Sequence, residues 1–343
     1  MTTKKTTSIA TSLGVCVTLL LAVSTVRISA GQGGTTAVAI DADDIGGVVT
    51  SPSGPEAGVW VIAEARDLPT RYIEAVVTDD RGRFVVPDLP KANYDIWVRG
   101  YGLVDSAKVT SAPGKLLNLS ATLAQDAAAA AHYYPAIYWY SMLHIPSADQ
   151  FGGKSSIPAK VTQTGWLNQM KNNGCIGCHQ IGQESTRTIP SAFGTFKTPA
   201  AAWLRRVASG QSGQQMTGQL LSLGPMGAEL LGDWTDRIAK GELPHAKPMR
   251  PQGLERNIVV TLRGLGDQQH YLHDVISTDK RYPTTNGYGP IYGSPEFSTD
   301  LLPILDPVKN TATTFRAPVR DPQMPLSLGP GHAAGLKAMQ PSA

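Results

Sequence analysis

The sequence predicts a multidomain chain: an all-β sandwich, then a mainly α domain, then an irregular segment with some strand. Between residues 45 and 123, short runs alternate apolar and polar residues, and turn-forming Gly, Pro and Asp separate them. Between residues 157 and 249, apolar residues recur at the spacing of helices. After residue 250, short apolar runs are broken by frequent Gly and Pro.

Composition sets broad limits on function. The length of 343 residues allows two or three domains, and a hydrophobic content of 41% is enough for a globular core. The formal net charge of +3 is close to neutral and no dense basic cluster occurs, so we expect no nucleic-acid partner. The 35 glycines and 25 prolines indicate a loop-rich protein.

The first 30 residues have the pattern of a signal peptide. Lys4 and Lys5 precede an apolar run over residues 13–23, and small residues over 28–30 offer a cleavage site. An uncleaved membrane anchor is the alternative. No membrane span is expected after the leader, so we predict a periplasmic or secreted bacterial protein.

Residues 31–44 are small and polar and are expected to form a flexible linker. Alternating runs then predict about seven short strands, which form a β-sandwich over residues 45–123. Asp79 to Gly82 has the composition of a tight hairpin turn. The clearest of these runs are residues 46–50, 58–65, 72–78, 83–86, 94–99 and 115–123.

Three phrases within this region carry a resemblance. They are GGVVT at 46–50, GVWVIAE at 58–64 and TDDRGRFVVPDLPKANYDIWVRGYG at 78–102. Together they resemble the carboxypeptidase regulatory-like domain, although Ala92 stands where that pattern usually has Gly. The resemblance implies an immunoglobulin-like sandwich related to carbohydrate-binding folds, with a glycan as a conceivable partner.

Three aromatic residues of the predicted sandwich invite two interpretations. Trp60, Tyr94 and Trp97 could stack on a sugar, but their places on alternating strands favour the core. A linker is expected next, over 124–156, with an Ala-rich and helical start. The aromatic stretch 132–140 within it would either cover the edge of a cofactor or seal a domain junction.

The mainly α domain is predicted over residues 157–249. Gln163 to Asn172 has a helical apolar face, and Thr198 and Pro199 are an N-cap and first-turn pair for a second helix. A third helix is predicted from Gly227 to Lys240, with Gly241 as its stop.

Within this domain the sequence Cys175-Ile-Gly-Cys178-His179 is the attachment pattern of c-type haem. Each thiol can add to one vinyl group of the porphyrin, and the tether then holds His179 against the iron as the proximal ligand. We therefore predict haem c as the cofactor, bound covalently by Cys175 and Cys178. Export agrees with this prediction, because c-type haem is attached outside the cytoplasm.

Other interpretations of the two cysteines are a redox dithiol, half of a zinc site or a short disulfide. The remaining cysteine, Cys16, lies in the predicted leader, so a four-ligand zinc site lacks ligands at the usual spacing. A thioredoxin-like pair would follow a strand in a βαβ unit, and Ala-, Gly- and Pro-rich sequence surrounds this one. None of these alternatives requires the adjacent histidine.

A helix before the haem motif and an aromatic-bearing helix late in the domain resemble class I cytochromes c, over about residues 157–242. Pro190 follows His179 by eleven residues. In that family a proline at such a spacing offers its carbonyl to the Nδ1–H of the proximal histidine, which the resemblance implies for Pro190.

The sixth iron ligand is left open by the sequence. Met216 ends a Gly-rich stretch, 210–216, that is expected to be a loop, and it is our first candidate. Met249, in Lys-Pro-Met-Arg-Pro, and Met226, at the start of the third helix, are alternatives. His245 or an open site are the remaining ones.

Residues 250–343 are expected to be irregular, with one strand within 251–262, turn-rich sequence around 271–277 and 288–294, and a hairpin over 302–315. The hairpin phrase Leu-Asp-Pro-Val-Lys-Asn, followed by Phe315, resembles a blade of streptogramin lyase-like propellers. That resemblance implies the onset of a propeller that is cut short. His270, His273 and Asp274 would then be site residues of a larger assembly, although surface positions are the more ordinary interpretation.

The sequence as a whole favours an exported monohaem electron carrier that works with a redox partner protein and does no bond chemistry itself. One alternative is a truncated propeller oxidoreductase or lyase in which the haem relays electrons. Another is a module that binds a glycan or a partner through the sandwich.

Overall fold

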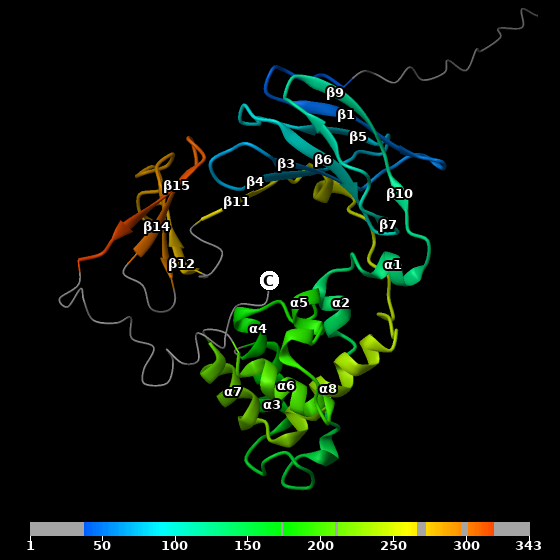
Figure 1. The fold of residues 1–343 in the computed structure, drawn as a ribbon, viewed down its shortest axis with the longest axis vertical. Helices are drawn as coiled ribbons and strands as arrows, with labels where there is room; N and C mark the ends of the chain where they lie inside the picture. The colour runs from blue at the N-terminus through cyan, green and yellow to red at the C-terminus, as the bar shows by residue number, and fades with distance from the viewer. Residues whose placement is uncertain (1–37, 173, 210–211, 266–271, 296–300, 319–343) are drawn as a thin grey trace, which may run out of the picture. The chain divides into compact units, whose positions relative to one another are not determined.

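The computed structural model describes residues 38–172, 174–209, 212–265, 272–295 and 301–318. The predicted signal peptide and residues 31–37 of the predicted linker lie outside the described residues. The described chain contains several β-sheets, mostly antiparallel, together with helices (Figure 1). This arrangement is consistent with the predicted β-sandwich.

The sandwich region contains two main sheets. The first has the order β2-β1-β5, with β9 on β1 as a parallel neighbour, and comprises β1 (Ile45–Ser51), β2 (Gly54–Pro55), β5 (Arg83–Val86) and β9 (Lys115–Ser120). The second has the order β11-β4-β3-β6-β8 and comprises β3 (Trp60–Ala65), β4 (Tyr72–Val77), β6 (Tyr94–Arg99), β8 (Val109–Ser111) and β11 (Val260–Arg263). A two-stranded sheet pairs β7 (Leu103–Val104) with β10 (Thr122–Leu123).

Alternation along the strands sends every second apolar side chain into one buried cluster. Ile45, Val61, Ile96 and Tyr94 are fully buried there. Trp97 is also buried, in a smaller cluster with Ile62 and Ile73. The expectation that Tyr94 and Trp97 are core residues is therefore confirmed.

The predicted hairpin around Asp79–Gly82 is wrong in one respect. The turn is tight, with the Gly82 amide donating to the Asp79 carbonyl at 3.0 Å, but β4 and β5 belong to different sheets. The Gly82 carbonyl accepts a hydrogen bond from the amide of Val49 in β1. A Cβ at position 82 would lie 2.5 Å from the Val49 carbonyl oxygen, so glycine lets the turn pack directly on β1 and start a strand beside it.

The strand predicted near 251–262 extends the sandwich, which the sequence did not indicate. It is β11, and it pairs antiparallel with the edge strand β4. Arg250 fixes the start of this segment, because its Nη1 lies 2.5 Å from Glu56 Oε2 and its Nε donates to the Tyr101 carbonyl at 3.0 Å. Glu56 is 6% exposed, so its charge depends on Arg250 for compensation.

Replacing Arg250 by Ala is expected to destabilise the protein by about 3 kcal/mol, because it leaves the buried Glu56 carboxylate unpaired. Urea unfolding followed by circular dichroism measures the change. The control is Arg81→Ala at an exposed turn position, for which we expect a change of less than about 0.5 kcal/mol. Equal stability of the two variants would show that the ion pair does not hold this segment.

The last described strands form one antiparallel sheet in sequence order, β12-β13-β14-β15. They are β12 (Leu272–Ile276), β13 (Ile291–Pro295), β14 (Leu301–Asp306) and β15 (Thr311–Arg316). The predicted hairpin over 302–315 is confirmed: β14 pairs with β15, and the Asp306 carboxylate accepts the amides of Val308 and Lys309 in the turn. Its assignment to a propeller stays a prediction.

The helices lie between the sandwich strands and β11 in sequence (Figure 1). They are α1 (Ala127–Ala131), α2 (Ala136–Tyr140), α3 (Gln163–Lys171), α4 (Cys175–Cys178), α5 (Glu184–Arg187), α6 (Pro199–Val207), α7 (Gly213–Ser222) and α8 (Pro225–Ala239), with 3-10 turns η1 (Ala148–Gln150), η2 (Ser191–Phe193) and η3 (Gly253–Asn257). The three predicted helices are confirmed as α3, α6 and α8, and Thr198 caps α6 through the Ala201 amide. No helix in these described ranges is long and apolar enough to cross a membrane.

The Gly-rich stretch before Met216 differs from the prediction. Residues 210–211 lie outside the described residues, but Gly213 already begins α7 and Met216 lies in its first turn. Gly213 and Leu220 are buried on the inner face of α7. Burial of this face outweighs the low helix propensity of glycine, which is about 1 kcal/mol per residue.

The helices surround their own apolar cluster. Trp166 and Met170 of α3, Trp203 of α6, Leu220 of α7 and Trp234 of α8 are buried in it. The region predicted as a linker also supplies buried members, namely Ala131, Tyr134, Trp139, Met142 and Phe151. Residues 124–156 are therefore packed against the helices over much of their length.

The aromatic stretch 132–140 makes contacts of two kinds. Its first half touches the sandwich, because the Tyr133 hydroxyl accepts from the Asp105 amide at 3.1 Å and Tyr134 lies edge-on to Tyr101. Its second half, Trp139 and Tyr140, is buried among the helices. Of the two roles left open by the sequence, these contacts support the junction.

Helices α6 and α8 approach closely at Gly232, where an added Cβ would lie 2.7 Å from the Pro199 carbonyl carbon. We expect Gly232→Ala to destabilise the protein by about 1–3 kcal/mol, because the two backbones must separate. This sign is opposite to the gain of roughly 1 kcal/mol that helix propensity alone gives.

Gly218→Ala is the matched control, since Gly218 is exposed on α7 and an added Cβ meets nothing within 4 Å. Thermal unfolding followed at 222 nm compares the variants. A gain in stability for both would contradict the close approach at Gly232.

Candidate functional site

The Cys175–His179 motif begins almost directly after α3. Helix α3 ends at Lys171, and α4 starts at Cys175. Gly174 makes this junction possible, because an added Cβ there would lie 2.1 Å from the Gln169 carbonyl oxygen. Its carbonyl then accepts the Gly177 amide at 3.0 Å, which closes the first turn of α4. The sequence therefore places both cysteines and His179 on one short turn held by α3.

Cys175 faces apolar surroundings. It is partly buried against the helical cluster, and its Sγ lies 3.8 Å from the Met170 Sδ. Burial raises the pKa of the Cys175 thiol, so the group is a protonated thiol at neutral pH. A zinc ligand or a redox nucleophile works as a thiolate, which this environment disfavours.

His179 follows the last residue of α4 and is exposed. Loss of hydration to the surrounding protein lowers its pKa, and the positive charge of Arg206 lowers it further. The imidazole is therefore mostly neutral at pH 7, which is the form that binds a metal. None of the described residues forms a hydrogen bond with the ring.

Pro190 precedes η2, and its carbonyl accepts the Phe193 amide at 3.0 Å. A carbonyl oxygen has two lone pairs, so this bond leaves one available. The pairing of Pro190 with His179 stays a prediction.

The distal candidates differ in exposure. Met216 and Met226 are partly buried against the helical cluster, whereas Met249 is 80% exposed. His245 is exposed as well. A thioether that replaces water at iron needs an apolar setting, and the two partly buried methionines have one.

The turn suits a covalently bound haem by the chemistry of its donors. It carries two thiols and a mostly neutral imidazole, and one thiol faces an apolar cluster. An added Cβ at Gly177 would meet only the Asn172 carbonyl oxygen, at 3.9 Å, so other side chains do not crowd the middle of the turn. Cys175, Cys178 and His179 would hold it.

The segment that contains the Cys175–His179 motif is rich in positively charged residues, which the sequence analysis did not consider. Residues 171–209 contain five Lys or Arg and one Glu. Arg206 is the charge that acts on His179, and Arg187 is buried in α5. The local excess of cations could have been read from the sequence.

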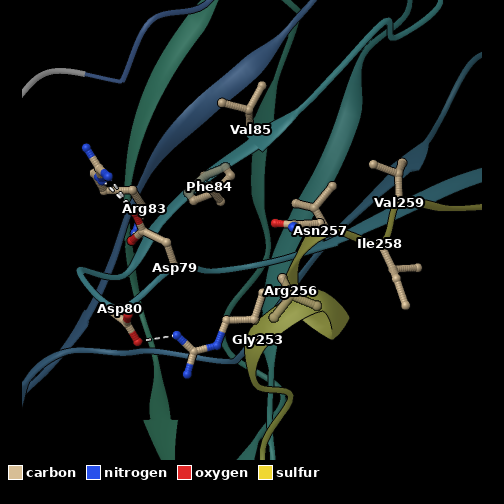
Figure 2. A pocket seen from close by; sticks show the side chains of 12 residues that line it. Asp79, Asp80, Arg83, Phe84, Val85, Gly253, Arg256, Asn257, Ile258 and Val259 are labelled. Carbon is tan, nitrogen blue, oxygen red and sulfur yellow. Dashed lines mark hydrogen bonds and ion pairs between the residues drawn. The ribbon is translucent and has the colours of Figure 1, made fainter.

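A separate hollow of about 570 Å³ lies on the sandwich, between β5 and the segment from η3 to β11 (Figure 2). Its charged groups are already paired, Asp79 with Arg83 at 2.7 Å and Asp80 with Arg256. The only aromatic side chain in its lining, Phe84, is buried. The hollow thus offers a sugar no exposed aromatic face.

Two other groups of residues that could bind a metal or form a site lie away from the Cys175–His179 motif. Asp41, Asp43 and Asp44 are close enough for their carboxylates to share a cation, and two of the three are exposed. His270 lies outside the described residues, and His273 and Asp274 lie on β12.

A scan against protein-family models finds no match for this chain, and a search of curated proteins finds none either. Function must therefore be inferred from the residues and contacts themselves.

Proposed function

We propose that this protein is an exported monohaem c-type cytochrome, an electron-transfer module whose α domain is joined to a β-sandwich. The observation that carries the proposal is the α4 turn, which holds Cys175 and Cys178 with His179 directly after it and in which Cys175 packs against an apolar helical cluster. The resemblance to class I cytochromes c supports it, since an aromatic-bearing helix, α8, also packs late in this domain.

Each part of the site has a task in such a carrier. The bound haem would supply one-electron chemistry at its iron. Cys175 and Cys178 would anchor it by thioether bonds, and the mostly neutral His179 offers a lone pair for the iron. The cluster around Trp166, Met170 and Trp203 would exclude water from one side. An apolar surrounding disfavours the added charge of the ferric state.

Replacing both Cys175 and Cys178 by Ala is expected to abolish covalent haem. The test is haem staining of a denaturing gel, together with a pyridine haemochrome spectrum, on protein exported from a cell that matures c-type haem. The double variant should lose the stain completely. Gly218→Ala is the control, because it changes an exposed residue of the same domain and should stain as the wild type does. Equal staining of the double variant would refute the proposal.

Met216 is expected to be the sixth ligand. In that case oxidised protein shows the weak near-infrared band of sulfur bound to ferric iron, and Met216→Ala removes the band and lowers the midpoint potential. Met226→Ala and Met249→Ala are matched controls that should leave both unchanged.

Loss of the band in Met249→Ala alone would move the ligand to the Lys247–Pro251 segment. Rapid carbon monoxide binding by high-spin wild-type protein would mean an open sixth position. It would then favour an enzyme or a sensor over a simple carrier.

A further inference from the structure

The edge strand β11 and the residues just before it form an exposed, uncharged segment with high strand propensity. The strand lies at one end of the five-stranded sheet, with β4 on one side and no strand of the described chain on the other. The segment Asn257-Ile-Val-Val-Thr-Leu262 contains no charged residue and no proline, and every residue in it is exposed. Val260 is 46% exposed and Leu262 is 56% exposed. Such an edge is a template for pairing with another strand, and native proteins ordinarily cover or charge it.

The opposite edge of the same sheet has that protection. Lys108 directly precedes the short edge strand β8. Within β8, the Thr110 hydroxyl donates to the Asp95 carboxylate at 3.0 Å, and Asp95 also pairs with Arg66 at 3.6 Å. Charged side chains along an edge oppose the approach of a second strand. Residues 257–262 carry no such charges, so the edge at β11 is the one suited to a partner.

Side chains along β11 alternate between the two faces of the sheet. Thr261 Oγ1 lies 3.3 Å from Oε2 of Glu74, a buried carboxyl group of β4, so Thr261 faces the inside of the sandwich. Val260 and Leu262 flank it and therefore lie on the outer face. The residues of β4 that pair with these two belong to an apolar cluster as well. A further strand beside β11 would thus extend an apolar surface.

The backbone groups of β11 alternate too. Just after the strand, the Gly264 amide donates to the carbonyl of Arg71 at the start of β4, at 2.8 Å. The even-numbered residues of 260–264 therefore direct their N–H and C=O groups toward β4. The odd-numbered ones, 261 and 263, direct theirs toward the open edge.

The same alternation begins before β11. Ile258 has extended dihedral angles, with φ −85° and ψ 128°, and its side chain and that of Val259 lie on opposite sides of the chain (Figure 2). Val259 therefore also directs its backbone groups toward the open edge. Three alternate residues, 259, 261 and 263, thus offer hydrogen-bonding groups to a further strand.

We propose that β11 pairs with β11 of a second copy of this chain and so joins two five-stranded sheets across a two-fold axis. A strand that pairs with itself about such an axis runs antiparallel to its copy. An axis at Thr261 uses the outward backbone groups of all three residues, because Val259 then faces the partner's Arg263. Moving the axis by one residue in either direction would leave one of the three unused. The proposal goes beyond electron transfer and does not require haem.

The side chains in this arrangement are complementary. Thr261 faces the partner's Thr261, and on the outer face Val260 lies opposite the partner's Leu262. Cross-strand pairs of matching character stabilise a sheet, and like charges directly opposite each other destabilise it. Here no like charges meet, since each Arg263 faces a valine. The edge is therefore complementary to itself, which favours a second copy over an unrelated segment as its occupant.

Disulfide cross-linking of the full-length exported protein tests the register. Val260 and the partner's Leu262 form a non-hydrogen-bonded pair with Cα atoms about 4.5 Å apart, a separation that a disulfide spans. We expect the double variant Val260→Cys/Leu262→Cys to give a covalent dimer on a non-reducing gel after mild oxidation. Each single variant places its cysteine opposite an aliphatic residue, so neither should cross-link. Wild-type protein controls for Cys175 and Cys178.

Sedimentation velocity tests the association itself. Wild-type protein should show a concentration-dependent monomer–dimer equilibrium. Leu262→Lys should raise the dissociation constant on the order of tenfold, because it removes both Val260–Leu262 pairs and charges the edge. Val109→Lys is the matched control, since Val109 is 40% exposed on β8, at the other edge of the same sheet, and should leave the dissociation constant unchanged.

Three outcomes would overturn the proposal. A wild type that stays monomeric at its highest soluble concentration would leave this edge to an unrelated extended partner. Equal weakening of the dimer by Leu262→Lys and Val109→Lys would place the contact elsewhere. Cross-linking of the single variants as fast as the double variant would reject the register. Haem staining of the same samples keeps this test separate from the proposed function, because stained and unstained protein should dimerise alike.

Discussion

The position of the attachment turn depends on one buried hydrogen bond, from the Tyr140 hydroxyl to the Met170 carbonyl at 2.7 Å. Burial raises the pKa of Tyr140, so its hydroxyl stays a donor at all ordinary pH values. The Tyr140 ring lies edge-on to Trp234, and the Trp234 indole donates to the Trp139 carbonyl. Helices α2, α3 and α8 are thereby joined at one point. Since α3 ends four residues before Cys175, this point determines where α4 begins.

The same turn borders two different environments. Cys175 packs against the helical cluster with its Sγ 3.8 Å from the Met170 Sδ, while His179 is exposed and its pKa is lowered by burial and by the charge of Arg206. The proposed haem therefore depends first on the spacing of the cysteines and the adjacent histidine, and the packing of Cys175 agrees with it.

Local periodicity was enough to predict most elements, but it does not identify their partners. The strands of the sandwich, helices α3, α6 and α8, and the β14–β15 hairpin are present where the sequence indicates them. The turn at Asp79 to Gly82 was interpreted as a hairpin because its composition is local, whereas the choice of β1 as partner depends on a distant carbonyl. Strand β11 likewise joins β4 across almost 190 residues of sequence, and α7 forms where glycines suggested a loop.

In the candidate site, too, the sequence indicates the neighbouring residues of a motif but not their partners from other elements. Cys175, Cys178 and His179 are adjacent in sequence, so the motif alone indicates their chemistry. Arg187 and Arg206 are separated by a turn and part of a helix, and although residues 171–209 contain five Lys or Arg and one Glu, the sequence does not show which carboxylates fold near each arginine. The only acidic residue in this stretch, Glu184, lies closer to His132. The proposed haem is thus indicated by the motif, and the fold adds to it only the packing of Cys175 against the helical cluster.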